Sequence, residues 1–567
     1  MFIRKYPFRF EAVFALILCA LLFLFAKLSY IQFFRSDYLD RLAQKQHNLF
    51  LKLEPDRGNI YDRNLRPFAL NLPSQSLYAV PLEISDTSGM VKKLSELLDL
   101  DTDYLEDRLN RRKYFIWIAR KLAQEKYEEL QSLKLKGLGF IRESSRYYPN
   151  RHLASHVLGF TGIDFYGLEG LELYYDTYLK GKEGWCFILR DAKQKGLLLE
   201  KEFVPRKNGY NLVLTIDENI QFIVERELDV GMEKYNAKAA TIVMMDPKTG
   251  EILAMANRPT FDPHSLQASN REFRRNRAIT DFFEPGSVFK IVTASAALEE
   301  DMVTEDDVFF CENGEYRVAN HILHDHRPHA NLTFREVIEQ SSNIGVTKVA
   351  QILGPDIVYQ YMKLFGFGDL TGIDLPGEVS GIAKDPSQWS KTSIGAIPMG
   401  QEVTVTTLQL ARAISCIANK GILMKPFVVR AITDQHGELI KEFKPREVRR
   451  VISEDVALRM QSILTGVVER GTGRWAKIKG VNMAGKTGTA QKVENGTYSH
   501  SKFRATFIGF IYNEEEPIIA MAIMFDEPRP HHFGGTVSGP VFKAIARDTL
   551  KYLNNVSLRE AIPLHSE

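Results

Sequence analysis

The chain has 567 residues, of which 44% are hydrophobic and 25% are charged, a composition that is typical of folded globular proteins and excludes wholesale disorder. Its 73 Lys and Arg residues nearly balance its 71 Asp and Glu residues, and the net charge of +2 offers no electrostatic footprint for a nucleic acid. The cysteines are too few and too far apart for a disulfide framework or a thiolate zinc site: they are Cys19, Cys186, Cys311 and Cys416.

The amino end carries an apolar segment that predicts a membrane anchor. Residues 12–26 are fifteen consecutive uncharged residues, and apolar neighbours extend them to a predicted membrane-spanning helix over 10–34, the one span in the chain. Basic residues precede this helix, so we expect a cytoplasmic tail at 1–9 and the rest of the chain outside the cytoplasmic membrane. A cleaved secretory signal is the alternative, but Lys27 and Arg35 follow the apolar run where a small-residue cleavage site would be needed.

The region after the anchor carries no pattern that indicates chemistry. Residues 36–56 look helical and then extended, and a turn-rich loop, RGNIYDRN, follows at 57–64. Residues 90–135 are rich in Lys, Glu and Leu with helical periodicity, which predicts a small helical module for packing or for binding a partner.

The second half of the chain alternates strand and helix patterns. The predicted elements are a strand at 211–217, a helix at 218–235, and two hairpins, formed by 239–246 with 251–257 and by 507–512 with 518–525. The segments between the two hairpins are mostly helical. This order predicts an α+β domain with one antiparallel sheet whose strands come from both ends of the domain.

The stretch DFFEPGSVFKIVTASAALEE at 281–300 contains the first candidate for catalysis. A proline and a glycine precede an alanine-rich helix, and Ser287 and Lys290 are spaced i and i+3, so they share one helix face. A serine becomes a nucleophile when a base removes its proton, and a lysine about 3 Å away can do so if burial lowers its pKa. The alternative is a capping serine beside an exposed lysine, and Ser499 with Lys502 repeats the spacing in a polar loop.

Ser341 and Asn343 form the single S-x-N of the chain, inside an apolar helical stretch at 336–353. At a helix end this hydroxyl and this amide could project into a cleft, where the hydroxyl relays a proton and the amide holds a substrate carbonyl. Local capping of a break in the helix is the alternative.

Lys486, Thr487, Gly488 and Thr489 lie in MAGKTGTAQ, directly before the second hairpin. They offer a cation, two hydroxyls and a glycine that lets a ligand approach the backbone, a set that suits a substrate carboxylate on an edge strand. Backbone N–H groups of such a strand could also line an oxyanion hole. A second K-T-G, at 248–250, falls in the first hairpin turn and is interpreted as structural.

The three motifs in this order resemble those of the penicillin-binding transpeptidases and serine β-lactamases. The class B, monofunctional penicillin-binding proteins are similar in further segments: RGNIYDRN, YYPNRHLASHVLGFTG, GLEGLELYYDTYLKGKEG, LTIDENIQ, MMDPKTGEILAMANRPTFDP and GFGDLTGIDLPGE. This resemblance runs from the anchor to about residue 550. Two segments, HLASHVLGFTG and FGGTVSGPVF, resemble the septal, cell-division member more than the elongation member.

The resemblance implies an α+β fold and a domain order. We expect the single transmembrane helix, an elongated pedestal or dimerisation-type domain at 35–220, a transpeptidase domain at 221–555 with an antiparallel sheet flanked by helices, and a tail at 556–567. In the family, the region that matches 57–220 docks membrane partners. A polytopic glycosyltransferase and other divisome membrane proteins are therefore the expected partners, and no nucleic acid is expected.

The resemblance also implies a penicillin-sensitive serine D,D-transpeptidase of the bacterial inner membrane, with its catalytic domain on the periplasmic side. It would cross-link peptidoglycan stem peptides through an acyl-enzyme, and it would need no metal or other cofactor. The implied roles are nucleophile for Ser287, base for Lys290, proton relay for Ser341, donor-amide binding for Asn343, carboxylate binding for Lys486, Thr487 and Thr489 beside Gly488, and an oxyanion hole from the backbone N–H groups of Ser287 and Thr489.

Three alternatives remain open at this point. An elongation-type transpeptidase would use the same chemistry with other partners. A hydrolase, either a D,D-carboxypeptidase or a β-lactamase, is disfavoured by the anchor, the pedestal and the lack of a recognisable deacylating glutamate. A β-lactam sensor or a scaffold forms the third class, and a sensor would need more than the short predicted cytoplasmic tail.

Histidines gather in two places in the sequence. His321, His324, His326 and His329 surround Asp325, but the family has a variable loop there, so we predict no metal site. His531 and His532 precede the last predicted helix, and we interpret them as solvated surface near the mouth of the expected cleft; contact with the substrate is the alternative.

Overall fold

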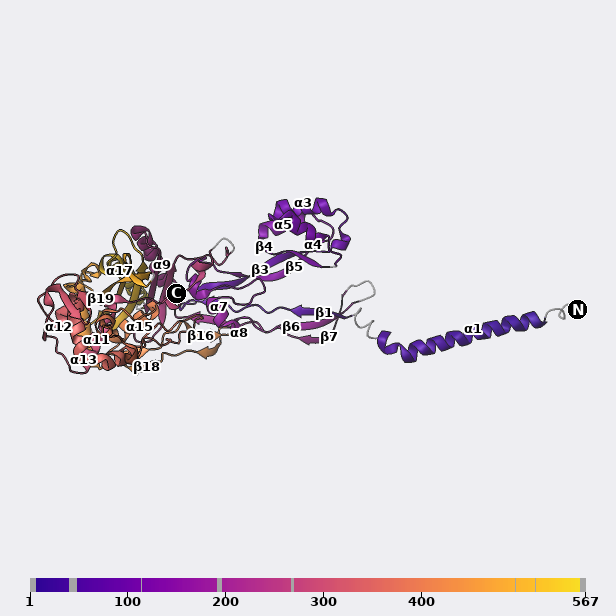
Figure 1. The fold of residues 1–567 in the computed structure, drawn as a ribbon. Coiled ribbons are helices and arrows are strands. Elements are labelled where there is room, and N and C mark those ends of the chain that lie inside the picture. The colour runs from indigo at the N-terminus through magenta and orange to yellow at the C-terminus, as the bar shows by residue number, and fades with distance from the viewer. Residues whose placement is uncertain are drawn as a thin grey trace, which may run out of the picture. The chain divides into compact units, whose positions relative to one another are not determined.

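The computed structural model describes residues 7–39, 48–113, 115–190, 196–266, 270–494, 496–514 and 516–560. These residues form two compact units (Figure 1). The first unit is Met1–Asp56 with Gly181–Asn208, and the second is Arg57–Lys180 with Gly209–Glu567.

The first unit contains the apolar helix and a small sheet. Helix α1 (Pro7–Phe34) includes a segment, Phe10–Phe34, that is long and apolar enough to cross a membrane, with a mean hydropathy of 2.5 and none of it buried. Strands β1 (Asn48–Leu53), β6 (Gly184–Arg190) and β7 (Gly196–Val204) form an antiparallel sheet in the order β1-β6-β7. Residues 40–47, which belong to the segment predicted to be helical and then extended, lie outside the described residues.

The second unit begins with a mixed region of strands and short helices. Its elements are β2 (Ile60–Tyr61), β3 (Pro67–Ala79), η1 (Pro81–Glu83), α3 (Thr87–Leu98), α4 (Thr102–Leu109), β4 (Ile116–Leu122), α5 (Gln124–Ser132), β5 (Leu138–Tyr147), α6 (Ser155–Leu158), α7 (Gly170–Tyr174) and α8 (Asp176–Leu179). The prediction of an all-helical module at 90–135 is wrong, because β4 lies inside it and pairs with β3. Ile116 and Ile118 are both buried, with a less buried residue between them, as expected for a strand. Ile118 belongs to the core that includes residues of α3, α4 and α5.

Buried charges tie this region together. Arg57 donates from Nε to Glu172 at 2.6 Å, and Arg146 donates from its own Nε to the other oxygen of the same carboxylate at 2.6 Å. Arg57 also pairs with Asp176 at 2.7 Å. Glu172 and the two arginine side chains are almost fully buried. The RGNIYDRN loop is thereby linked to the segment that contains α7 and α8.

A five-stranded antiparallel sheet forms the centre of the remaining part, in the order β10-β9-β21-β20-β19. Its strands are β9 (Ala239–Met245), β10 (Ile252–Arg258), β19 (Asn482–Glu494), β20 (Thr497–Asn513) and β21 (Glu516–Asp526). Both predicted hairpins are confirmed, and β9 and β21 bring them side by side. The α+β fold with strands from both ends of the domain is therefore also confirmed.

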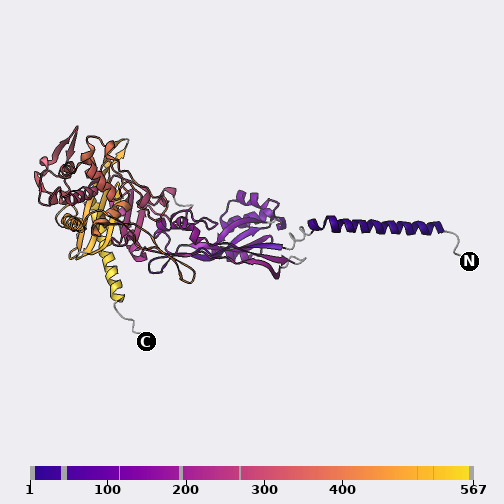
Figure 2. The same cartoon turned by 90° about the horizontal axis from the view of Figure 1, so that it is seen from below.

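Helices cover both faces of this sheet (Figures 1 and 2). Helix α9 (Glu218–Tyr235) occupies the predicted range and packs with α17 (Gly534–Glu560) on one face, while α15 (Thr407–Ala418) packs on the other. Successive residues of β9 alternate between the two cores: Ile242 belongs to the core that includes α9 and α17, and Val243 belongs to the opposite core. Burial on both faces explains why these strands read as continuous apolar runs.

The other elements surround this sheet. They are β8 (Asn211–Leu214), η2 (Arg271–Arg274), α10 (Arg277–Thr280), η3 (Gly286–Phe289), α11 (Lys290–Glu299), β11 (Val308–Phe310), η4 (Glu312–Gly314), β12 (Glu315–Val318), β13 (His321–His324), β14 (Asn331–Thr333), α12 (Phe334–Glu339), α13 (Asn343–Leu364), η5 (Pro386–Gln388), α14 (Ser393–Ala396), η6 (Ile397–Met399), β15 (Ile422–Met424), β16 (Val429–Thr433), β17 (Leu439–Glu442), β18 (Glu447–Arg450), α16 (Glu454–Glu469) and η7 (Arg474–Ala476). A second, seven-stranded sheet joins β17, β16 and β8 to β2–β5.

Candidate active site

Ser287 lies in the turn that leads into helix α11. It belongs to the 3-10 turn η3, and Lys290 is the first residue of α11, so the predicted i, i+3 relation holds. Ser287 is partly exposed, whereas Lys290 is completely buried. Gly286 adopts a φ of +60° and lies so near the K-T-G strand that a Cβ atom would be 3.0 Å from the Thr489 carbonyl oxygen. The turn therefore holds Ser287 directly against β19.

The buried Lys290 amine reaches the S-x-N turn. Its Nζ donates to the Ser341 carbonyl oxygen at 2.5 Å, to Asn343 Oδ1 at 2.8 Å and to Ser341 Oγ at 3.2 Å. Among the contacts of the described residues, the Ser287 hydroxyl has no hydrogen bond to this amine. The predicted Ser287–Lys290 contact therefore remains a prediction for the substrate complex, in which catalytic hydrogen bonds often tighten.

The S-x-N residues lie at a break between two helices. Helix α12 ends at Glu339, α13 begins at Asn343, and Ser341 takes a left-handed conformation with φ of 64°. Asp325 caps the second helix: it accepts from the backbone N–H groups of Asn343 and Ile344 and from the Ser342 hydroxyl. The strained turn points the Ser341 hydroxyl toward both lysines.

The K-T-G residues lie on β19, the edge strand of the central sheet. Lys486 Nζ donates to Ser341 Oγ at 2.8 Å, and it is fully buried. Ser341 Oγ thus lies between the amines of Lys290 and Lys486, and these three residues form one hydrogen-bonded chain. The structure brings together the residues of all three predicted motifs.

Burial shapes the charge of the two lysines. It lowers the pKa of Lys290 to about 7, against the opposing effect of the Asp325 charge. Burial also lowers the pKa of Lys486 well below its ordinary value, and the nearby Lys290 ammonium lowers it further. A neutral amine is therefore accessible at physiological pH, which is what a general base requires.

The backbone of β19 faces the nucleophile turn at Thr489. The Thr489 carbonyl points toward Gly286, and in an antiparallel strand the N–H of a residue points to the same side as its C=O. The N–H of Thr489 therefore points out of the sheet, toward the turn with Ser287. The Thr489 hydroxyl accepts from the Gly534 N–H at 3.1 Å, which leaves its own proton free to donate.

The sequence repeats of the motifs lie elsewhere and have other partners. Lys248 of the first K-T-G forms an ion pair with Glu516 at 2.5 Å. Ser499 and Lys502 of the second S-x-x-K lie on strand β20 and not in the predicted polar loop, and Lys502 forms an ion pair with Glu494. The ion pair of Lys248 is consistent with the structural interpretation of the first K-T-G.

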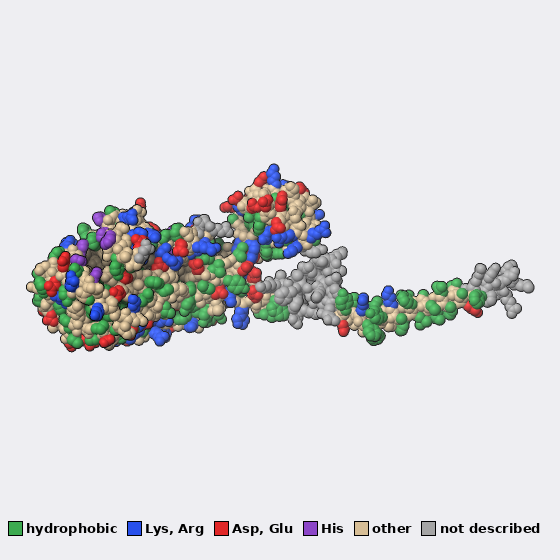
Figure 3. Space-filling model, viewed as in Figure 1, with side chains coloured by type: hydrophobic (Ala, Val, Ile, Leu, Met, Phe, Trp, Pro, Cys, Tyr) green, Lys and Arg blue, Asp and Glu red, His purple; other side chains and the backbone are tan. Residues whose placement is uncertain are grey.

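The histidines meet aromatic side chains beside the site. His326 follows the capping Asp325, Phe533 precedes Gly534, and their ring centroids are 4.7 Å apart. His532 stacks on Phe503 at 4.1 Å. Figure 3 shows histidine side chains gathered beside a hollow in this surface. Among the described residues, no three His, Cys, Asp or Glu side chains are placed to hold a metal ion.

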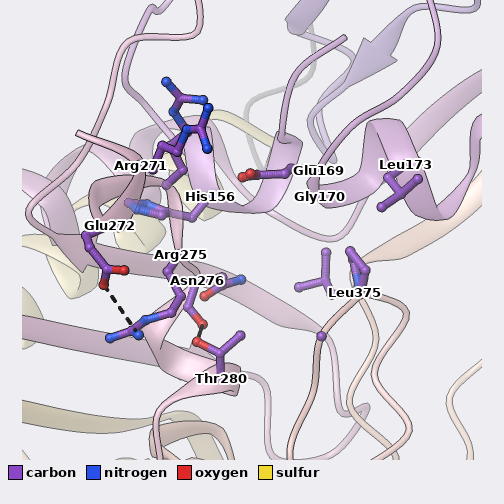
Figure 4. Close-up of a pocket in the computed structure, with 13 residues that line it drawn as sticks. His156, Glu169, Gly170, Leu173, Arg271, Glu272, Arg275, Asn276, Thr280 and Leu375 are labelled. Atoms are coloured by element: carbon purple, nitrogen blue, oxygen red, sulfur yellow. Dashed lines mark hydrogen bonds and ion pairs between the residues drawn. The ribbon is translucent and has the colours of Figure 1, made fainter. Parts of the chain in front are cut away.

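A separate cavity of 390 Å³ lies at the junction of α6–α7 with the segment before the nucleophile turn (Figure 4). Glu169, Arg271, Arg274 and Arg275 are among the residues that line it. None of the predicted site residues lines it. Inside it, Arg275 pairs with Glu272 at 3.5 Å.

Sequence reasoning missed the residues that hold the motifs in place. Asp325 was considered only as part of a histidine cluster, yet it caps the S-x-N helix from 18 residues upstream. Gly534 and Thr472 contact the two threonine hydroxyls of the K-T-G-T strand from other segments. An isolated Asp, Gly or Thr in a loop carries no pattern, so these contacts could be found only in three dimensions.

Comparisons with known proteins agree with this arrangement. Residues 240–547 match the penicillin binding protein transpeptidase domain, and residues 52–214 match the penicillin-binding protein dimerisation domain. Stage V sporulation protein D of Bacillus subtilis is 36% identical, covering 93% of this chain and 83% of that protein. The peptidoglycan D,D-transpeptidase FtsI of Escherichia coli is 33% identical, covering 96% and 92%.

A solved structure is also similar. Penicillin binding protein 3 from Mycobacterium tuberculosis, in complex with aztreonam, has a TM-score of 0.69 and 28% identity, covering 89% of this chain and 97% of that one. The family matches cover both the catalytic part and the region before it, in the order that the sequence motifs indicate. The chain therefore belongs to the class B penicillin-binding proteins, with a dimerisation domain followed by a transpeptidase domain.

Proposed function

We propose that this protein is a penicillin-sensitive peptidoglycan D,D-transpeptidase that cross-links stem peptides during septal wall synthesis. The observation that carries the proposal is the hydrogen-bonded chain Lys290–Ser341–Lys486. The Ser341 hydroxyl lies within hydrogen-bond distance of both buried lysine amines, and Ser287 lies three residues before Lys290. Such a chain can take a proton from a nucleophile and return it to a leaving group. The septal assignment is supported by the similarity to FtsI over nearly the whole chain.

Acylation begins when the Ser287 oxygen attacks the carbonyl carbon of the D-Ala–D-Ala bond. The neutral Lys290 amine takes the hydroxyl proton as the O–C bond forms. The N–H groups of Ser287 and Thr489 donate to the oxyanion of the tetrahedral intermediate. The C–N bond then breaks, and the proton passes through Ser341 to the departing D-Ala nitrogen.

The acyl-enzyme is resolved by an amine of a neighbouring stem peptide. Its nitrogen attacks the ester carbonyl and gives up one proton to the Lys290–Ser341–Lys486 relay. The C–O bond to Ser287 then breaks, and the relay returns that proton to the serine oxygen. Asn343 holds the amide of the donor peptide through its side chain. The oxygen of that side chain accepts from Lys290, and its nitrogen donates to the His324 carbonyl at 2.9 Å, which fixes the orientation of the amide.

The terminal carboxylate of the donor binds along β19. Lys486, Thr487 and Thr489 supply a cation and two hydroxyls there, and Gly488 leaves room for the ligand backbone. A β-lactam carries a carboxylate and a strained amide in a similar arrangement. It therefore acylates Ser287 as the peptide does, but its leaving group stays attached.

The anchor and the first half of the chain provide the location. We place residues 1–9 in the cytoplasm and residues 35–220 and 221–555, as pedestal and catalytic domains, on the periplasmic side, on the strength of the basic residues before α1. The pedestal is proposed to dock a polytopic glycosyltransferase and other divisome membrane proteins. Alkaline phosphatase fused after residue 560 should be active if this orientation is right and inactive if it is reversed.

The test of the catalytic assignment is labelling with a fluorescent penicillin. Membranes with the wild-type protein should show a labelled band, and Ser287→Ala should abolish it. Ser499→Ala is the matched control, because it removes the serine of the second S-x-x-K and should label like wild type. Equal labelling of Ser287→Ala and wild type would contradict the nucleophile assignment.

Depletion in the native bacterium separates the septal function from the elongation alternative. Cells that lack a septal transpeptidase continue to grow without dividing, so we expect filaments. Round cells would instead support an elongation function with the same chemistry. Rapid turnover of penicillin by the purified protein would favour the hydrolase alternative.

A further inference from the structure

A threonine outside the three motifs contacts the carboxylate-binding strand. The hydroxyl oxygen of Thr472 lies 2.8 Å from the hydroxyl oxygen of Thr487. Thr472 belongs to the loop between α16 and η7, and its side chain is partly buried, while Thr487 is buried. This hydroxyl pair adjoins Lys486 and Gly488 in the K-T-G strand.

The loop that carries Thr472 is fixed from two sides. On one side, the Thr472 N–H donates to the Glu339 carbonyl at 3.2 Å, and the Glu339 carboxylate pairs with Arg470 at 2.5 Å. Gly471 lies so near that a Cβ atom would be 2.2 Å from the same Glu339 carbonyl oxygen. On the other side, a Cβ atom at Gly535 would be 2.5 Å from the Thr472 carbonyl oxygen. The backbone of Thr472 is therefore packed on both sides, and its hydroxyl lies beside that of Thr487.

The two hydroxyls carry two protons. One proton forms the hydrogen bond between the two oxygens, and the other is available for a different acceptor. If Thr487 donates to Thr472, the Thr487 proton is used up and Thr487 offers a carboxylate only lone pairs. If Thr472 donates to Thr487, the Thr487 proton is free to donate to a carboxylate, and the donated hydrogen bond strengthens it as a donor. A bound anion selects the second arrangement.

We infer that Thr472 is a further positioning residue of the transpeptidase: it donates to Thr487 and so directs the Thr487 proton to the terminal carboxylate of the acyl donor. This inference rests on the proposed function, which places that carboxylate along β19. Thr472 acts through Thr487 and does not itself touch the substrate. Its loss should therefore weaken recognition of the carboxylate and leave the reacting atoms unaffected.

The experiment compares two acyl donors that differ only in this group. They are the benzoyl-D-alanyl thioester of mercaptoacetic acid, which ends in a carboxylate, and its methyl ester. Acylation efficiency of the full-length protein in detergent is measured with both donors for wild type and for Thr472→Val, which keeps the shape of the side chain and removes the hydroxyl. We expect Thr472→Val to lower efficiency roughly tenfold for the carboxylate donor and less than about twofold for the ester.

Two further variants separate positioning from other roles. Thr472→Ser restores a hydroxyl and should return the carboxylate donor to within about twofold of wild type. In a Thr487→Val background, adding Thr472→Val should have no further effect, because the proton that it directs is gone.

The outcomes are distinct. Equal losses with both donors in a variant that unfolds at the wild-type temperature, no loss with either donor, or a loss that persists in the Thr487→Val background would each overturn the inference. Thermal unfolding of each variant shows whether a loss with both donors reflects misfolding. If it does, the Thr472→Ser variant and the double-mutant cycle of Thr472→Val with Thr487→Val test the inference instead. If wild type itself is not labelled by fluorescent penicillin, the proposed function has failed, which is a different result.

Discussion

The site depends on two amines that are removed from water. Lys290 and Lys486 are both completely buried, and both contact the hydroxyl of Ser341. A buried ammonium is costly without a carboxylate partner. Asp325, whose charge acts on Lys290, accepts hydrogen bonds from the start of α13. Burial therefore favours the neutral amine and lowers the pKa of Lys290, and the neutral amine can act as a base.

The pKa of Lys290 predicts the pH dependence of acylation. The neutral amine is the active form, so the rate should rise with pH through about 7 and level off above it. The neutral fraction of such a group increases from about a tenth at pH 6 to about nine-tenths at pH 8, so the second-order rate of β-lactam acylation should rise about tenfold. Stopped-flow or gel-based labelling, corrected for hydrolysis of the β-lactam without protein, measures it.

Lys290→Arg supplies the control for this prediction. A guanidinium stays protonated across the whole range and should not support acylation at any of these pH values. A wild-type rate that does not change between pH 6 and pH 8 would rule out Lys290 as the titrating base.

The K-T-G motif is positioned by contacts between secondary-structure elements. Strand β19 is held in place not only by its ladder with β20 but also by the start of α17, which packs on its surface. A Cβ atom at Gly534 would lie 2.3 Å from the Gly488 carbonyl oxygen and 2.2 Å from the Thr506 carbonyl oxygen. The first residue of α17 thus touches the backbone of both β19 and β20, and its N–H binds Thr489.

Gly534→Ala should therefore displace the K-T-G strand. Both neighbours are backbone atoms that cannot rotate away, so we expect a loss of about 1–3 kcal/mol in unfolding free energy and a clear reduction in penicillin labelling. Gly539→Ala is the matched control in the same helix, because its new Cβ would have no neighbour nearer than 3.6 Å. Thermal unfolding and labelling of the two variants test this, and equal behaviour would contradict the proposed contact.

At the scale of the whole molecule, the region before the transpeptidase domain contains a buried charge network formed by Arg57, Arg146 and Glu172. Burial alone would raise the pKa of Glu172, but the charges of Arg146 and Arg57 lower it, so the carboxylate stays ionised. This carboxylate joins strand β5, helix α7 and the loop before β2. The network holds together the part of the second unit that matches the dimerisation domain.

Glu172→Gln should destabilise this region strongly. It leaves two buried guanidinium groups without their shared anion, and breaking a buried ion pair in this way costs about 3–5 kcal/mol. Asp164→Asn is the control, because it removes a largely exposed partner of Arg120 and should cost less than about 1 kcal/mol. Chemical denaturation at neutral pH measures both variants, and similar midpoints would contradict the prediction.

The sign of the pH effect follows from the lowered pKa of Glu172. Its contribution to stability is complete above the ordinary carboxyl value of about 4.3 and is lost as the pH falls through the folded value below it. The difference between wild type and Glu172→Gln should therefore persist at pH 5 and shrink only in stronger acid. A difference that disappears already at pH 6 would mean that another group carries the effect.

Much of the architecture followed from local patterns. The apolar runs of the two hairpins and the range of α9 were predicted because a strand buried on both faces and an amphipathic helix leave direct marks in the order of residues. The spacing of Ser287 and Lys290 likewise implied a shared helix face. The module at 90–135 was predicted incorrectly, because the alternation that favours β4 covers only a few residues and its pairing partner, β3, lies some 40 residues earlier.

What the sequence determined by itself was the two hairpins, helix α9, the three motifs and the apolar segment at the amino end, because each depends on residues that are near one another in the chain. What only the tertiary structure decided was how these motifs are held: the cap from Asp325, the contact of Gly534 with β19, and the hydroxyl pair of Thr472 with Thr487. Each contact joins a single residue in a loop or at a helix end to an element that is distant in the chain, and a single polar residue or glycine carries no periodicity. Their geometry comes from the packing of the helices and the sheet around them, so it exists only after the chain has folded.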